Sequence, residues 1–197
     1  MDNIAENWPP FKGDYIIGDP ESCIAVVTLA SSIETCDEAA IWGTCKTENL
    51  GVEKVVTNVI SNSNIRYILL CGGESRGHLS GKSLISLHEN GIDNNGRIIG
   101  SEGAIPFIEN IPESAIKRFQ EQVDIVDMTG ITDTEKIHRL VHEYYRKNGP
   151  YEENPYILQK NNKKPAKTIK AGSSADIIIS EEFGIDSVTG SIFKINV

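Results

Sequence analysis

The strongest constraint on the fold is an alternation of short apolar runs with longer amphipathic segments. Residues 52–60, 80–90, 112–123 and 132–147 carry apolar side chains at helical spacing. Apolar runs typical of buried strands stand before or between them, at residues 23–29 (CIAVVTL), 65–71 (IRYILLC) and 124–128 (DIVDM). Strands that alternate with helices predict an α/β fold with a mainly parallel sheet flanked by helices. We also expect an irregular lead-in over residues 8–20 and a short strand at 97–99.

The composition changes after Gly149-Pro150, which suggests a boundary between domains. Residues 150–170 are polar and basic and contain two prolines, so they predict a linker. Two strand-like runs, at 175–179 (ADIII) and 191–197 (SIFKINV), surround a turn-rich stretch. We therefore predict a main domain over 1–149, a basic linker over 150–170 and a small β appendage over 171–197. The linker is either a solubilising connector or a docking site for an acidic partner.

The charge balance argues against nucleic acid as a partner. The chain has 19 Lys and Arg against 28 Asp and Glu, a formal charge of −9, so phosphates would be repelled. No apolar run approaches the ~20 residues of a membrane span, and the N-terminus MDNIAENWPP has no signal-peptide pattern. Four cysteines without a CxxC motif are expected as free thiols. Together these features predict a cytoplasmic protein.

The segment 65–91, IRYILLCGGESRGHLSGKSLISLHENG, is the best candidate for a binding site. It predicts a strand, a glycine-rich turn and a helix, and ligands of open α/β sheets bind beyond the carboxyl ends of strands. The P-loop pattern fails at essential positions, because His78-Leu79 follows Gly77 and Arg76 stands where the earlier glycine of Gly81-Lys82-Ser83 is needed. A standard nucleotide site is therefore not expected, and an atypical phosphate site stays open as an alternative.

The histidines differ in what their positions allow. His78 follows the strand directly, where an imidazole would be displayed to a ligand or would serve as a structural residue. His88 falls in the last turn of the next helix, where a structural role beside the helix dipole is expected. His138 and His142 share a helix face at zinc-ligand spacing, but no third ligand is indicated nearby.

Several segments together resemble one known family, the corrinoid-carrying A subunit of tetrahydromethanopterin S-methyltransferase. The similar stretches span residues 7–128 in order: NWPP, KGDYIIGDPES, CKTENLGVEKVV, NVISN, IRYILLCGGESRGHLSGKSLISLHENGID, IIGSEGAIPFIENIPE and RFQEQVDIVDM. The resemblance implies a Rossmann-like fold that carries a cobamide (cobalamin or 5-hydroxybenzimidazolylcobamide) with a histidine as the lower axial ligand of cobalt. That histidine lies in the family's GH[IL][ST]G stretch, which is Gly77–Gly81 here, so His78 is the matching position. The cobalamin motif DxHxxG is absent because Arg76 stands two residues before His78.

The resemblance also implies which residues surround the cofactor. An axial histidine needs a carboxylate or carbonyl partner for its second ring nitrogen, and Asp19, Glu48 and Glu74 are open candidates. The expected cofactor-binding residues come from three loops: Gly72, Gly73, Glu74, Gly77, His78, Leu79, Ser80, Gly81, Thr47, Glu48, Asn49, Ala104, Ile105 and Pro106.

The implied function is that of a methyl carrier. In the family, methyl-tetrahydromethanopterin gives its methyl group to the cobamide, which passes it to the thiolate of coenzyme M. Partner subunits are expected to bind the methyl donor and the acceptor. The family member in the membrane complex ends in a hydrophobic anchor, whereas this chain closes with GSIFKINV, so we expect a relative without a membrane span. Two alternatives remain: a non-catalytic corrinoid-binding protein for storage or sensing, and an atypical nucleotide-binding α/β domain.

Overall fold

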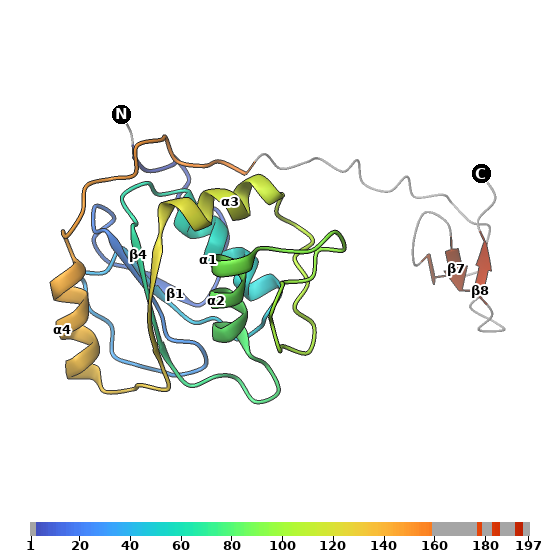
Figure 1. Ribbon diagram of the computed structural model, residues 1–197, viewed down its shortest axis with the longest axis horizontal. Coiled ribbons are helices and arrows are strands. Elements are labelled where there is room, and N and C mark those ends of the chain that lie inside the picture. Colours follow the sequence, from blue (N-terminus) through green and yellow to red (C-terminus); the bar gives the residue numbers. More distant parts are fainter. Residues whose placement is uncertain (1–2, 159–176, 179–182, 186–191, 195–197) are drawn as a thin grey trace. The chain divides into compact units, whose positions relative to one another are not determined.

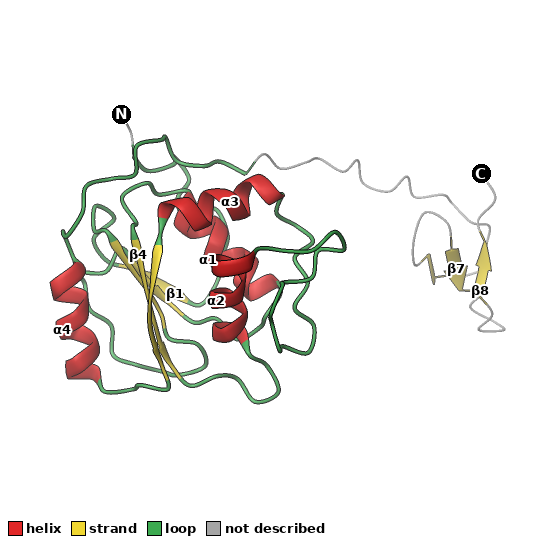
Figure 2. Ribbon diagram, in the orientation of Figure 1, coloured by secondary structure: helices red, strands yellow, loops and turns green. Residues whose placement is uncertain are grey.

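The computed structural model describes residues 3–158, 177–178, 183–185 and 192–194. The chain divides into two units, residues 1–158 and residues 159–197. The first unit is a mixed α/β structure in which a five-stranded sheet separates one helix from three others (Figures 1 and 2).

The five strands are short and mostly parallel. They are β1 (Tyr15–Ile17), β2 (Ile24–Val27), β3 (Ile41–Gly43), β4 (Tyr67–Gly72) and β5 (Asp124–Thr129), in the spatial order β1-β3-β2-β4-β5. Strands β3, β2, β4 and β5 pair in parallel, with Val26 opposite Leu69 and Leu69 opposite Val126, and β1 pairs antiparallel to β3 at one edge. The carboxyl ends of the four parallel strands therefore meet at one side of the sheet.

Successive residues of the central strands divide between two cores, because side chains alternate across a sheet. Ala25, Val27, Ile68 and Leu70 face α1 (Leu50–Ile60), α2 (Ser80–Asn90) and α3 (Glu113–Gln122). The alternate residues, among them Val26 and Leu69, face α4 (Thr134–Tyr144) through its Ile137 and Val141. Strands β2 and β4 are therefore covered by helices on both faces, which explains their uninterrupted apolar sequence.

Capping residues set the helix limits. Asn49 accepts a hydrogen bond from the Leu50 amide at the start of α1, and Asp133 accepts one from the Lys136 amide at the start of α4. Pro112 precedes α3, and Gly91 ends α2 with a φ of 71°. The helices predicted at 52–60, 80–90, 112–123 and 132–147 are confirmed, although α4 is shorter than predicted at both ends.

Three local predictions need correction or completion. The predicted lead-in over residues 8–20 contains strand β1, and β3 was not predicted at all. Residues 97–99 form only isolated bridges, Ile98 to Ile92 and Arg97 to Phe107, instead of a strand. Strands β1 and β3 are three residues long, too short for a period-2 pattern to be recognised.

Residues 151–158 belong to the first unit and pack against its helices, although the sequence placed them in the linker. The Tyr151 amide donates to the Ser63 carbonyl at 2.7 Å, and the Tyr156 amide donates to the Ile60 carbonyl at 2.9 Å. Arg118 is only 5% exposed and donates to Glu153 Oε2 at 2.8 Å and to the Asn154 carbonyl at 3.0 Å. We call residues 151–158 the strap, because they run across α1 and α3 to the end of the first unit.

In the second unit, the described residues form three short antiparallel strands. They are β6 (Ile177–Ile178), β7 (Phe183–Ile185) and β8 (Ile192–Lys194). Two fall within the predicted strands at 175–179 and 191–197, and β7 was not predicted. Residues 159–170 of the predicted linker lie outside the described residues, and the predicted domain limits stay predictions.

Candidate functional site

Three loops meet at the carboxyl ends of the parallel strands and bring the predicted site residues together. Residues 44–49 follow β3, residues 73–79 follow β4, and residues 99–111 belong to the connection between α2 and α3. The Ser80 hydroxyl donates to the Cys45 carbonyl at 2.6 Å, which ties the start of α2 to the first loop. This is the edge of the sheet at which a ligand was expected.

His78 and Glu48 form the centre of this site. His78 Nδ1 lies 2.6 Å from Glu48 Oε2, and the second carboxylate oxygen, Oε1, accepts the Ile105 amide at 2.9 Å. The side chain of Glu48 is 1% exposed, whereas that of His78 is 44% exposed. One buried carboxylate therefore connects members of all three loops.

The electrostatics of Glu48 favour its ionised form. Burial raises its pKa, but the hydrogen bonds from the Ile105 amide and from His78 outweigh burial and hold the pKa below its ordinary value. An ionised carboxylate only accepts hydrogen bonds, so the proton of a neutral His78 must sit on Nδ1. Nε2 then carries a lone pair that can bind a metal ion.

The other two candidate partners of His78 are engaged elsewhere. Asp19 accepts hydrogen bonds from the Tyr145 hydroxyl and from Arg146 at 3.1 Å, near the end of α4. Glu74 accepts the amides of Gly81 and Lys82, each at 3.0 Å, and the Ser80 hydroxyl at 3.2 Å. The structure therefore selects Glu48 among the three carboxylates that the sequence left open.

The position of Glu74 also bears on the nucleotide alternative. Its carboxylate occupies the amides at the start of α2, the place where a helix would receive a phosphate. A phosphate bound by Gly81-Lys82-Ser83 would have to displace this side chain. The geometry thus disfavours the atypical phosphate site that the GKS triplet suggested.

The glycines in and beside the β4–α2 loop differ in how closely they are packed: Gly72 ends β4, Gly77 lies in the loop and Gly81 lies in the first turn of α2. Gly72 has a φ of 79°, and a Cβ there would lie 2.3 Å from the Thr28 carbonyl oxygen, so only glycine fits. Gly81 is also crowded, because a Cβ there would lie 3.0 Å from atoms of Leu29 and Glu74. Gly77 has a φ of 81° but an open surrounding, with nothing within 4 Å of a Cβ. The loop is thus closely packed at both ends and open beside His78.

The remaining predicted residues support the loops. Thr47 Oγ1 accepts the Gly51 amide at 2.9 Å, Asn49 caps α1, and the Gly73 amide donates to Ser31 Oγ at 2.9 Å. Ala104 and Ile105 are exposed, Leu79 is half-buried and Pro106 is buried. No direct bond joins Ala104, Pro106 or Leu79 side chains to His78; these residues are neighbours in the loops only.

Sequence reasoning missed a second carboxylate that holds the 99–111 loop. Glu53 of α1 is 4% exposed and accepts the amides of Glu109 at 2.6 Å and Asn110 at 2.8 Å, and the Asn110 side-chain amide at 2.8 Å. Ser83 and Ser101 hydroxyls are 2.7 Å apart beneath the same loop. The sequence did contain a signal for this role, because Glu53 lies on the buried face of the helix predicted over residues 52–60.

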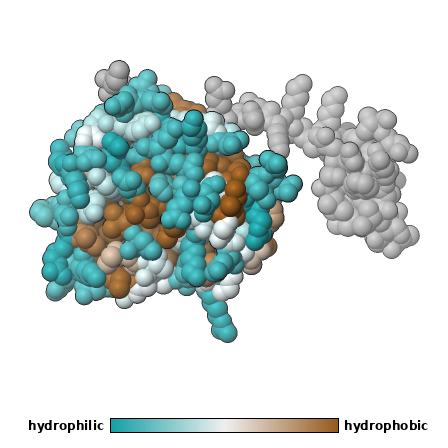
Figure 3. All heavy atoms as spheres, viewed as in Figure 1, coloured by the Kyte–Doolittle hydropathy of each residue, from teal (hydrophilic) through white to brown (hydrophobic). Residues whose placement is uncertain are grey.

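Exposed apolar side chains accompany the site. Ile105 is 58% exposed and Leu50, next to Asn49, is 56% exposed; Ile99 begins the same loop as Ile105 and is 45% exposed. Figure 3 shows hydrophobic surface both where β5 runs and where the loops between α2 and α3 run. Ile105 and Leu50 adjoin the residues that hold His78, so they could contact an apolar part of a ligand.

The other histidines are structural or peripheral. His88 Nε2 lies 2.7 Å from the Val123 carbonyl oxygen and its ring meets Phe119 edge-on, as expected for a structural residue. His138 contacts the Glu34 carbonyl and His142 contacts Glu38. Within residues 3–158 and the three short strands of the second unit, no group of three His, Cys, Asp or Glu side chains could hold a metal ion.

Three of the four cysteines are buried. Cys23, Cys45 and Cys71 are buried, and burial raises the pKa of Cys45 and of Cys71 to about 12. The thiols of Cys45 and Cys71 are therefore protonated at neutral pH and act as packing residues. All four cysteines are free.

In the part of the chain that the structure describes, no helix is both long enough and apolar enough to cross a membrane.

Comparison with known proteins supports the family that the sequence stretches between residues 7 and 128 resemble. The family model for the A subunit of tetrahydromethanopterin S-methyltransferase matches residues 2–168. A protein of Methanosarcina acetivorans, named as the A subunit of a "Putative methyltransferase Mtx", is 57% identical over 192 residues, covering 98% of this chain and 97% of that protein. Its namesake in Methanosarcina barkeri is also 57% identical, over 100% of this chain and 99% of that protein.

A relative with the full family name is only slightly more distant. The first of the numbered A subunits of tetrahydromethanopterin S-methyltransferase in Methanothermobacter marburgensis is 51% identical over 160 residues, which are 79% of this chain and 67% of that protein. The family model covers most of the chain, and relatives above 50% identity include both named groups. The chain therefore belongs to the family of the A subunit of tetrahydromethanopterin S-methyltransferase.

Proposed function

We propose that this protein is a Rossmann-like, corrinoid-binding methyl carrier in which His78 is the axial protein ligand of cobalt. The observation that carries the proposal is the pair of His78 and Glu48, 2.6 Å apart at the carboxyl ends of parallel strands. Family membership supports the methyl-transfer role, and the His78–Glu48 pair supports a cofactor site at these strand ends.

The residues present fit a cobamide. A cobamide would bring cobalt that its own ring already holds, so the protein would need to add one nitrogen ligand and no cluster of ligands. His78 offers Nε2, because Glu48 keeps the proton on Nδ1. Ile105 and Leu50 are exposed and close in sequence to the loop residues that hold His78, so they would be available for apolar contacts with a bound cobamide. A bound cobamide would supply a cobalt ion able to accept a methyl group and pass it to a thiolate.

The protein itself would position the imidazole of His78 and keep one proton on Nδ1 of that ring. The buried carboxylate of Glu48 orients the ring and strengthens Nε2 as a donor, since it accepts the Nδ1 proton as a charged hydrogen-bond partner. The Ile105 amide fixes Glu48 in turn at 2.9 Å. Glu48 would hold the ring in the same orientation with or without a bound cobamide.

The substrates of the reaction belong to the complex as a whole. We propose methyl-tetrahydromethanopterin as the donor and the coenzyme M thiol as the acceptor, both bound by partner subunits. The names of the relatives, which describe each of them as one subunit of a methyltransferase, support a role within an assembly. A storage or sensing role for the same corrinoid site is the second candidate, and it would need the same His78 without partners.

Titration of the full-length apoprotein with hydroxocobalamin tests the proposal. The wild type should bind stoichiometrically and shift the visible spectrum, and His78→Ala should lose that shift. His138→Ala is the matched control, because His138 lies on α4 across the sheet. Equal spectra for wild type and His78→Ala would refute the axial role, and no binding by the wild type would refute corrinoid carriage. Methyl transfer with purified partner subunits then separates the carrier from a storage protein.

A further inference from the structure

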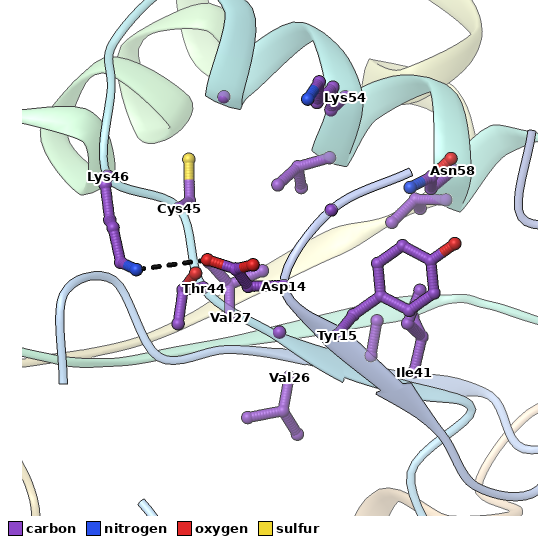
Figure 4. A pocket seen from close by; sticks show the side chains of 16 residues that line it. Asp14, Tyr15, Val26, Val27, Ile41, Thr44, Cys45, Lys46, Lys54 and Asn58 are labelled. Carbon is purple, nitrogen blue, oxygen red and sulfur yellow. Dashed lines mark hydrogen bonds and ion pairs between the residues drawn. The ribbon is translucent and has the colours of Figure 1, made fainter. Parts of the chain in front are cut away.

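The five-stranded sheet has two edge strands, β1 and β5, and they differ in length. Strand β1 has three residues, and its Tyr15 borders a cavity between α1 and the sheet together with Asn58 of α1 (Figure 4). Strand β5 has six residues, and among the described residues no strand pairs with its outer side. Because a short edge strand offers few hydrogen bonds to a further strand, β5 is the edge that is open to pairing.

The hydrogen bonds at the two ends of β5 show which way its amides are turned. The Asp124 amide donates to the Arg66 carbonyl at 2.9 Å, and the Gly130 amide donates to the Gly72 carbonyl at 2.7 Å. Both carbonyls lie on the β4 side, so the even-numbered residues of β5 turn their amides toward β4. Because successive residues of a strand alternate, the amides of the odd-numbered residues are turned outward.

The outward-facing residues of β5 are Ile125, Asp127 and Thr129. The Thr129 amide donates to Asp127 Oδ1 at 2.9 Å, which satisfies the last amide of the strand. Ile125 and Asp127 each keep an outward amide and an outward carbonyl, and within residues 3–158 no strand takes them up. A row of this kind is a template for an added strand.

Apolar side chains border the open edge on both faces of the sheet. Val126, Met128 and Leu140 lie at the margin of the core beneath α4, and Ile125 lies at the margin of the core on the opposite face; all four are half-buried. Figure 3 shows hydrophobic surface where β5 runs. A strand added to this edge would therefore bury apolar surface as well as complete hydrogen bonds.

We propose that the partner of this edge is a second copy of the chain, which pairs β5 with β5 antiparallel about a two-fold axis at Val126. Residues that face each other across an antiparallel pair point to the same side of the sheet. Val126 therefore faces its own counterpart, and Ile125 faces Asp127 of the second copy. Because Ile125 and Asp127 are the residues with outward amides, each such pair exchanges both of its hydrogen bonds.

This register also keeps like charges apart. Asp124 faces Met128 of the second copy, and Asp127 faces Ile125, so no two carboxylates stand opposite each other. An axis at Asp127 instead would set two Asp127 side chains face to face, and like charges directly opposite are destabilising. The pattern of β5 therefore favours one register of self-pairing.

The side of α4 that borders β5 is complementary in charge to itself. Lys136, Leu140 and Glu143 follow one side of α4 at helical spacing, and Lys136 and Glu143 are exposed. His138, on the opposite side of the helix, meets Trp42 of β3, so the side with Leu140 is turned toward β5. The two-fold axis turns the second helix end for end and brings Lys136 toward Glu143 of the second copy. This complementarity favours a second copy over an unrelated strand.

The pairing would leave both His78 sites accessible. The His78 loop follows the carboxyl end of β4, which is parallel to β5. Antiparallel pairing of the two β5 strands places these ends of the two copies at opposite ends of the joined sheet. The inference does not depend on corrinoid binding, and its failure would leave the proposed function intact.

Sedimentation equilibrium of the full-length protein measures the association. The wild type should form a dimer, and Asp127→Pro should raise the dimer dissociation constant at least about tenfold, because each copy loses one outward donor. The β4 ladder does not use this amide, and circular dichroism reports whether the fold is kept. Asp127→Ala is the matched control: it removes the same side chain, keeps the amide and should change the dissociation constant by less than about threefold.

Cysteine substitution tests the register and does not depend on the folding of the proline variant. Val126→Cys should form a disulfide between two copies under mild oxidation, because facing residues of a non-hydrogen-bonded pair have Cα atoms about 4.5 Å apart. Asp124→Cys is the matched control, since it faces Met128 and lies away from its own counterpart. Wild-type protein measures any cross-linking by the native cysteines. Non-reducing electrophoresis compares the three proteins.

Four results would overturn the proposal. The first is a wild type that stays monomeric at all concentrations. The second is a dimer that Asp127→Pro does not weaken, which would place the contact elsewhere on the chain. The third is cross-linking of Asp124→Cys as readily as Val126→Cys. The fourth is a monomer whose Ile125 and Asp127 amides gain protection from hydrogen exchange only with a partner subunit, which would assign the edge to another protein.

Discussion

The imidazole of His78 and the carboxylate of Glu48 are 30 residues apart in the sequence and 2.6 Å apart in the structure. Glu48 is almost completely buried, and His78 remains open on its other side. A buried carboxylate that accepts one ring proton leaves the second nitrogen as a directed metal ligand. The properties of the site should therefore depend on this pair and on the contacts that hold it.

Glu48→Gln should weaken axial ligation while preserving the fold. The amide has the same shape but no charge, so it no longer fixes the Nδ1 proton of His78 as strongly. Loss of such an outer partner typically lowers metal affinity by about 10–100-fold, and we expect a decrease in this range for hydroxocobalamin. Isothermal titration of both proteins measures the change. Glu102→Gln, at an exposed position, is the control, and equal losses in the two variants would mean that Glu48 has no special role.

Acid should destabilise the wild type partly through Glu48. The pKa of Glu48 in the folded protein is lowered, so the unfolded state takes up its proton first as the pH falls. The contribution of Glu48 to the free energy of unfolding is therefore fully present above the unfolded pKa of about 4.3 and is lost as the pH falls through the lower folded value. Urea unfolding between neutral pH and about pH 3.5 should show a shallower loss in Glu48→Gln than in the wild type. Parallel curves for the two proteins would contradict the shift.

Elements that depend on neighbouring residues could be predicted from the sequence, whereas elements that depend on residues far away in the chain could not. Helix α2 was predicted with its correct limits, because the glycine-rich turn before Ser80 and Gly91 after Asn90 are local signals. Strands β1 and β3 have three residues each, so their existence depends on pairing with each other and with β2 rather than on a local pattern.

The site was only partly predictable for the same reason. The resemblance pointed to His78, and the need for a carboxylate partner was clear from its chemistry. The choice among Asp19, Glu48 and Glu74 depended on how three loops fold together, and neighbouring sequence does not encode this choice. Glu53 holds the 99–111 loop through Glu109 and Asn110, which are 56 and 57 residues away, and it was missed.

Gly72 at the end of β4 and Gly77 in the following loop both have a positive φ, but they should respond differently to substitution by alanine. Gly72→Ala places a Cβ 2.3 Å from the Thr28 carbonyl oxygen and should lower the free energy of unfolding by more than the strain of the φ angle alone. Gly77→Ala meets no atom within 4 Å, so it should lose only the ~1–2 kcal/mol of left-handed strain. Urea unfolding of both variants measures the difference. Equal destabilisation would show that crowding at Gly72 is relieved by movement of the Thr28 segment.

Gly77→Val should also reduce corrinoid binding. The position is open in the structure and adjoins His78, so a branched side chain there would extend into the space that a ligand needs. Hydroxocobalamin affinity should fall well below that of Lys136→Ala, a surface control on α4. Unchanged affinity in Gly77→Val would place the corrin away from this loop.

Two truncated chains should separate the contribution of the strap to stability from any contribution of the second unit to binding. A chain that ends after residue 158 keeps the strap and should fold and bind hydroxocobalamin with nearly unchanged affinity. A chain that ends after residue 147 removes Glu153 and Asn154, which accept hydrogen bonds from buried Arg118, and should be destabilised by about 1–3 kcal/mol, the cost of leaving buried donors without partners. Chemical unfolding compares the two. Equal stability would show that the strap does not stabilise the rest of the first unit. Loss of binding in the chain that ends after residue 158 would show that the second unit contributes to the site.

Electron paramagnetic resonance of the cobalt(II) form tests most directly whether His78 is the axial ligand. The full-length wild type, loaded with cobalamin and reduced by one electron, should show hyperfine splitting from one axial nitrogen. Growth with nitrogen-15 histidine should change that splitting from the three-line pattern of nitrogen-14 to the two-line pattern of nitrogen-15, and His78→Ala should abolish this dependence on the label. A wild-type splitting that is unaffected by labelled histidine, or a dependence on the label that persists in His78→Ala, would contradict the assignment of His78 as the axial ligand.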